Sequence, residues 1–142
     1  MKKFLIIITL SIIACANAVY LTYQSYAYER ANELEKNTFS SFCDVNNQLS
    51  CTRVLQSPYA KFFGMPFPAL AMVVYPVLAL VALLGYLGLF QKAYITLFCM
   101  SVGGACFNGY YIYQEAVHIG AFCLLCLLCS GIILTIAWLS FV

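Results

Sequence analysis

The sequence contains very little charge. Of its 142 residues, 8% are Asp, Glu, Lys or Arg, whereas 64% are hydrophobic. Soluble globular domains carry about 25% charged residues, and this chain has too few to build a polar surface around an apolar core. The formal net charge is only +2 and the basic residues are scattered, which argues against a nucleic-acid partner. These shortages exclude an ordinary soluble domain and indicate that lipid is the main solvent.

Long uncharged runs predict the architecture. Charged residues are missing between Lys3 and Glu29, between Lys61 and Lys92, and from Lys92 to Glu115. No charge follows Glu115. Since a membrane-spanning helix needs about 20 apolar residues, we predict an all-α, four-helix membrane bundle that forms a single domain over residues 1–142. The predicted spans are Phe4–Tyr23, Phe67–Phe90, Ala93–Gln114 and Ile119–Val142.

The predicted connections differ in length. Almost all the charge lies in a long loop, Gln24–Pro66, whereas Gln91-Lys92 and Glu115–His118 read as tight turns. The first span also resembles a cleavable signal peptide, because Lys2-Lys3 and an apolar run precede Ala16-Asn17-Ala18. Its apolar character continues through Leu21, and we therefore expect an uncleaved helix. Charge does not decide the orientation, since basic residues occur on both sides.

Two cysteine pairs carry the chemistry. Cys43 and Cys51 lie in the polar loop, and Cys123-Leu124-Leu125-Cys126 opens the last predicted span. Positions i and i+3 share one face of a helix, and a helix N-terminus favours the thiolate that attacks disulfides. Two pairs that meet at one membrane face favour a redox relay. The other cysteines lie within apolar runs and are expected to pack: Cys15, Cys99, Cys106 and Cys129.

Two other interpretations of the cysteines are open. A Cys43–Cys51 bond that only staples the loop would stabilise it by roughly 2–3 kcal/mol. A metal site built on Cys123, Cys126 and Cys129 would place three thiolates in hydrocarbon without a clear fourth ligand, so we expect no metal.

The surrounding residues resemble the vitamin K epoxide reductase (VKOR) family in its bacterial form. The loop reads Cys43-Asp44-Val45, then Ser50-Cys51-Thr52-Arg53-Val54, Ser57 and Phe63-Gly64-Met65-Pro66, with the CxxC following on the last span. The order of the two pairs is the reverse of that in the related DsbB proteins. The resemblance covers nearly the whole chain.

The resemblance implies a disulfide relay that ends at a quinone, either ubiquinone or menaquinone. Cys43 would exchange with a thioredoxin-fold protein, and Cys51 would then attack Cys123. Cys126 would pass the electrons to the quinone, beside Ser57. Since the chain ends at Val142, we expect the thioredoxin-fold partner to be a separate periplasmic oxidase.

Some features of the family are missing. Members that reduce vitamin K carry an Asn in the second span and Thr-Tyr-Ala after the CxxC. Here Phe67–Phe90 has no Asn, and Cys129-Ser130-Gly131 stands after the CxxC. These differences favour a plain quinone reductase over an epoxide reductase.

Four further polar residues have two interpretations each. Asp44 either organises the loop or is a solvated acid. Glu115 and His118 either donate protons to the quinone or, as we favour, are solvated residues of a turn. Tyr75 either bonds a quinone carbonyl or, as we favour, packs.

We therefore predict a thiol:quinone oxidoreductase of the bacterial inner membrane that supports disulfide formation. Disulfide exchange belongs in an oxidising compartment, which places the long loop and Cys123 outside and both termini inside. The alternatives are a vitamin K-type quinone or epoxide reductase, and a non-catalytic four-helix membrane protein whose disulfide is structural.

Overall fold

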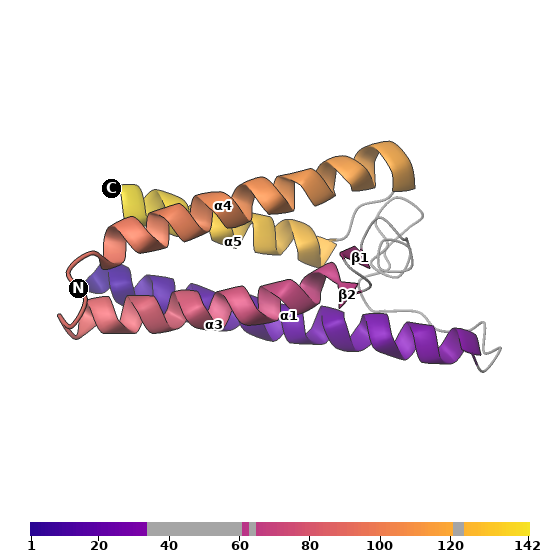
Figure 1. Cartoon of the computed structure of the whole chain (residues 1–142), viewed down its shortest axis with the longest axis horizontal. Coiled ribbons are helices and arrows are strands. Elements are labelled where there is room, and N and C mark those ends of the chain that lie inside the picture. The colour runs from indigo at the N-terminus through magenta and orange to yellow at the C-terminus, as the bar shows by residue number, and fades with distance from the viewer. Residues whose placement is uncertain (34–60, 63–64, 121–123) are drawn as a thin grey trace.

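The computed structural model describes residues 1–33, 61–62, 65–120 and 124–142. The described part is almost entirely helical, as Figure 1 shows. A short antiparallel pairing joins Phe62 to Met65 and Lys61 to Pro66. The elements in chain order are α1 (Lys2–Glu33), β1 (Lys61–Phe62), β2 (Met65–Pro66), α3 (Phe67–Tyr86), α4 (Ala93–Gln114), the π-helix η2 (Glu115–Ile119) and α5 (Leu124–Phe141).

Four of the described helices are long and apolar enough to cross a membrane, which confirms the predicted four-helix membrane fold. Their membrane-compatible ranges are Lys2–Ala27, Phe67–Tyr86, Ala93–His118 and Leu124–Phe141. The helix α4 has the predicted bounds. The first helix continues to Glu33 rather than ending at Tyr23, so the predicted start of the long loop at Gln24 is wrong. The second span ends at Tyr86 rather than at Phe90, and the last helix begins at Leu124 rather than at Ile119.

The predicted tight turn at Glu115–His118 is wrong, because these residues continue α4 as the π-helix η2. No Gly or Pro interrupts the chain between Gln114 and Ile119, so nothing ends the helix there. It ends at Gly120, which has a φ of 68° and donates its N–H to the Glu115 carbonyl at 2.8 Å. A left-handed glycine is a common helix terminator.

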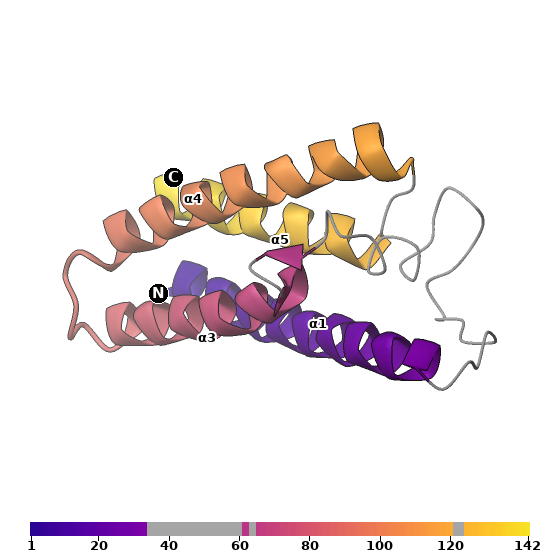
Figure 2. The same cartoon turned by 45° about the vertical axis from the view of Figure 1, so that its right-hand side comes forward.

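The helices form two adjacent pairs, with α1 beside α3 and α4 beside α5 (Figures 1 and 2). Both chain termini lie at one end of the bundle, together with the connection from α3 to α4. The opposite end holds the C-terminal end of α1, the short β pairing and the N-terminal ends of α3 and α5. We call it the thiol end, because α5 begins there and Cys126 is in its first turn.

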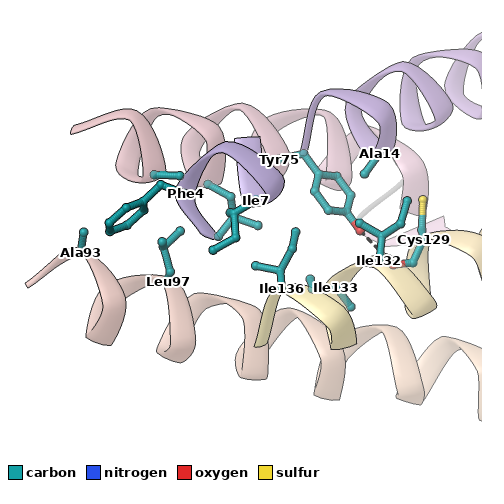
Figure 3. Packing of buried hydrophobic residues seen from close by; sticks show 12 residues of the cluster. Phe4, Ile7, Ala14, Tyr75, Ala93, Leu97, Cys129, Ile132, Ile133 and Ile136 are labelled. Carbon is teal, nitrogen blue, oxygen red and sulfur yellow. Dashed lines mark hydrogen bonds between the residues drawn. The ribbon is translucent and has the colours of Figure 1, made fainter. Parts of the chain in front are cut away.

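Side chains from all four helices pack along the centre of the bundle, as Figure 3 shows. At the end that holds the termini, a Cβ on Gly85 would lie 2.6 Å from the Ala93 Cβ and 2.7 Å from Phe4 Cε1. Glycine therefore lets α1, α3 and α4 approach closely there, as small residues commonly do between membrane helices. Many large apolar side chains are exposed on the outside, where lipid would cover them.

Candidate functional site

Only one of the four predicted relay cysteines lies within the described residues. Cys126 is in the first turn of α5 and is 4% exposed. Cys43, Cys51 and Cys123 lie outside the described ranges, as do Ser57 and Asp44. Within the described residues, the candidate site therefore centres on Cys126.

Cys126 lines a cavity of about 500 Å³ at the thiol end of the bundle. Its wall is mostly apolar and comes from α1, α3, α4 and α5. Leu70 and Val74 contribute from α3, and Met100 and Phe107 from α4. Small-molecule sites have this character: a concave apolar volume of about 300–1,000 Å³ with a few placed polar groups.

Two neighbouring glycines of α4 shape the cavity. A Cβ on Gly104 would lie 2.5 Å from Ile133 Cδ1, so this glycine leaves room for the Ile133 side chain of α5. Gly103 also lines the cavity, but a Cβ there would meet no atom within 4 Å. The first glycine accommodates a side chain of the neighbouring helix, and the second leaves space open.

Tyr75 on α3 reaches across the cavity to α5. Its side chain is 3% exposed, and its hydroxyl donates to the Cys129 carbonyl at 3.3 Å, the dashed line in Figure 3. The ring packs as predicted, and the hydroxyl brings one of the few polar groups to the cavity wall.

Cys129, which we expected to be a packing residue, lines the same cavity and is 6% exposed. Its sulfur accepts a hydrogen bond of 3.0 Å from Asn17 Nδ2 on α1. The same nitrogen donates to the Leu125 carbonyl at 2.9 Å. Sequence reasoning missed this contact, although an Asn inside an apolar span and a cysteine one turn after Cys126 were its signals.

Asn108 on α4 also lines the cavity and is 6% exposed. Its Nδ2 donates to Ser130 Oγ at 2.6 Å, and Ser130 Oγ donates to the Cys126 carbonyl at 3.1 Å. Asn108 Oδ1 is buried and has no hydrogen-bond partner among the described residues. Because a buried polar atom without a partner costs free energy, this amide is suited to a ligand. Sequence reasoning missed Asn108 as well.

The remaining predicted residues within the described ranges do not line the cavity. Cys99 and Cys106 are exposed on α4 and do not line the cavity, so their expected packing inside the bundle is wrong; Cys15 is half-buried. The expectation that Glu115 is solvated is also wrong, because it is 4% exposed, whereas His118 is exposed as expected. Within the described ranges, no three His, Cys, Asp or Glu side chains form a group that could hold a metal ion.

The site is thus a buried thiol on the wall of an apolar cavity inside a four-helix membrane bundle. The sequence profile of the vitamin K epoxide reductase family matches residues 5–141, nearly the whole chain. The chain therefore belongs to the vitamin K epoxide reductase family, and its class is that of membrane oxidoreductases that act on quinones or their epoxides. A comparison with curated protein sequences gave no match.

Proposed function

We propose that this protein is a thiol:quinone oxidoreductase of the bacterial inner membrane. It passes electrons from a separate periplasmic thioredoxin-fold dithiol protein to ubiquinone or menaquinone, and so supports disulfide formation. The observation that carries this proposal is the position of Cys126 on the wall of an apolar cavity lined by all four membrane helices. A thiol in that position is accessible to a lipid-soluble oxidant.

The first steps of the proposed relay are thiol–disulfide exchanges. A partner thiolate attacks the Cys43–Cys51 disulfide, and the partner leaves oxidised once its second thiol resolves the mixed disulfide. Cys51 then attacks Cys123 in the Cys123–Cys126 disulfide and releases Cys126 as a thiolate. Cys43 attacks Cys51 and frees Cys123, which leaves a reduced Cys123/Cys126 pair.

The last step transfers two electrons to the quinone ring. The Cys126 thiolate forms an adduct or charge-transfer complex with the ring, and the Cys123–Cys126 bond forms again as the ring leaves with two electrons and two protons. A dry apolar pocket favours this step because it excludes water from the complex. Tyr75 and Asn108 line the cavity, and we propose that they bond the ring oxygens, with Ser57 as a further neighbour of the ring.

The proposed orientation follows from the chemistry. Disulfide exchange needs an oxidising compartment, so the thiol end faces the periplasm. Both termini lie at the other end of the bundle (Figure 1) and would then be cytoplasmic.

A quinone epoxide is a second candidate substrate, and one observation favours it. Family members that reduce vitamin K carry an Asn in the second span, and α3 has none. Asn108 nevertheless brings an amide to the cavity from α4. An amide group is therefore available in the cavity from α4, and the lack of an Asn in α3 does not argue against a quinone epoxide as substrate.

Purified protein tests the proposal directly. Reduced thioredoxin serves as the dithiol donor, and a short-tailed ubiquinone or vitamin K epoxide serves as the acceptor. The absorbance of the acceptor measures its reduction. We expect quinone reduction that is lost in Cys126→Ser and retained in Cys106→Ser, a matched change outside the cavity. If neither acceptor is reduced, the proposal is wrong.

A trapping experiment tests the order of the relay. In the Cys43→Ala, Cys126→Ala double variant, Cys51 has no competing loop partner and Cys123 has no helix partner. On mild oxidation with diamide, which takes up the two electrons and two protons, a Cys51–Cys123 disulfide should therefore accumulate and appear in non-reducing peptide maps. A free Cys51 in that variant would mean that the two pairs do not exchange electrons.

A further inference from the structure

Two thiols, rather than one, line the cavity. Cys126 and Cys129 lie one helical turn apart on α5, and both side chains are buried. Their spacing is the same as that of Cys123 and Cys126. Residues at i and i+3 share a helix face with Cβ atoms about 5–6 Å apart. A disulfide needs these atoms about 3.5–4.5 Å apart, so a bond between the two sulfurs would require local movement of the helix and would be easily reduced.

Polar groups from two other helices contact Cys129. Asn17 Nδ2 on α1 donates to its sulfur at 3.0 Å, and the Tyr75 hydroxyl on α3 donates to its backbone carbonyl at 3.3 Å. Hydrogen-bond donors stabilise negative charge on a group that accepts from them. Polar side chains inside membrane spans are costly and commonly mark function. A cysteine that served only to fill space would not need the donor from Asn17.

The cavity also presents an unused acceptor. Asn108 Oδ1 has no hydrogen-bond partner within the described residues, whereas Asn108 Nδ2 is occupied by Ser130. An acceptor is matched by a hydroxyl group, which a quinone gains when it is reduced. The cavity thus combines two thiols with an acceptor that suits the reduced ring.

We propose that Cys129 is a third redox-active thiol, which completes quinone reduction by forming a transient disulfide with Cys126. This inference rests on the proposed thiol:quinone function. The Cys129 thiolate attacks the Cys126 sulfur that is engaged with the ring, and the sulfur–sulfur bond forms as the ring leaves with both electrons. Two thiols lose two electrons and two protons, and one quinone becomes one quinol.

The cycle then returns the disulfide to the predicted pair. Once Cys43 has attacked Cys51 and freed Cys123, the Cys123 thiolate attacks Cys126 in the Cys126–Cys129 bond, which restores Cys123–Cys126 and releases Cys129 as a thiolate that takes up a proton. The quinol can therefore form while Cys123 is still bonded to Cys51. Asn17 acts through the Cys129 sulfur and is a positioning residue.

A variant that lacks every other dithiol tests this step. We would combine Cys43→Ser, Cys51→Ser and Cys123→Ser, reduce the protein, remove the reductant and add a short-tailed ubiquinone whose ring positions are all substituted, which prevents simple arylation of thiols. We expect about one quinol per protein. Two thiols should become unreactive to maleimide, and tandem mass spectrometry should locate the bond between Cys126 and Cys129.

Matched variants make the result specific. Adding Cys129→Ser to the triple variant should abolish both quinol formation and the loss of two thiols, whereas adding Cys106→Ser should leave both unchanged. In the otherwise native chain, Cys129→Ser should slow multiple-turnover quinone reduction about tenfold, or more. An unchanged turnover rate there would overturn the proposal even if the triple variant failed to fold.

Measurements on the native protein distinguish failure of the Cys129 proposal from failure of the proposed thiol:quinone function. If it reduces the quinone and the folded triple variant forms no Cys126–Cys129 bond, Cys129 has no redox role and the proposed function stands. If the native protein reduces no quinone, both proposals are wrong.

Discussion

The Asn108 amide on α4 donates a hydrogen bond of 2.6 Å to the Ser130 hydroxyl on α5. Ser130 passes the connection on by donating to the Cys126 carbonyl at 3.1 Å. A side chain of the third membrane helix is thereby joined to the backbone of the residue that we propose reduces the quinone. The link also fixes the orientation of the amide, because Ser130 Oγ accepts from Nδ2 and leaves Oδ1 for a ligand.

Replacing Asn108 by Leu keeps the branched shape and the number of side-chain heavy atoms and removes both polar atoms. Loss of one hydrogen bond of about 0.5–1.5 kcal/mol predicts a KM for quinone that rises roughly two- to tenfold. Disulfide exchange with the thiol donor should not change. Thr135→Val, which removes an exposed hydroxyl bonded within α5, is the control. A KM equal to that of the native protein would exclude contact between Asn108 and the quinone.

Gly103→Leu should fill the open space beside the cavity. A Cβ at Gly103 meets no atom within 4 Å, so we expect the helix to tolerate the larger side chain and the quinone to be displaced. We predict a fall in kcat/KM for the quinone of about tenfold, which corresponds to about 1.4 kcal/mol. Gly109 on the same helix is also open and does not line the cavity, and Gly109→Leu should have little effect. Equal effects of the two variants would count against this binding site.

Asn17→Leu should destabilise the bundle, since it removes the donor to both Leu125 and Cys129. Interhelical hydrogen bonds in membranes contribute about 0.6 kcal/mol on average and up to about 1.7 kcal/mol. We expect a decrease in the free energy of unfolding within this range. Thr9→Val on the same helix removes a hydroxyl that bonds only the Leu5 carbonyl of its own helix in the described structure, and is the control. Reversible unfolding in mixed micelles gives the measurement.

The proposed orientation predicts which positions an impermeant maleimide labels in intact cells. A variant that retains Cys43 alone should be labelled from outside after mild reduction. A variant whose only cysteine is Gln91→Cys should be labelled only after the membrane is opened, because Gln91 is exposed at the end of the bundle that holds the termini. The reverse pattern would place the thiol end in the cytoplasm.

The four spans could be predicted because membrane helices depend on composition. Gaps in charge located them, and α4 was predicted to the residue. The π-helix at Glu115–Ile119 was missed, since a change from i+4 to i+5 hydrogen bonding has no residue signature in this segment. Gly120 is its one visible signal, because glycine accepts the positive φ that ends the helix.

The partners of Cys129 and Asn108 could not be predicted for a different reason. A helix in water shows which face is buried through its polar face, but the outer faces of these helices are as apolar as the inner ones. The sequence therefore does not indicate which face of each helix points into the bundle. The contacts of Asn17 with Cys129 and of Asn108 with Ser130 depend on that rotation, and only the folded bundle reveals them.

The length of α1 has a consequence for the proposed encounter with a water-soluble dithiol protein. The helix has 32 residues, and at 1.5 Å per residue it is about 48 Å long, whereas the hydrocarbon core is about 30 Å thick. A tilt of about 20° shortens its vertical span by only a few ångströms. The last turns of α1 therefore extend beyond the hydrocarbon core, and the dithiol partner that we propose would meet the end of a helix rather than a flat membrane surface.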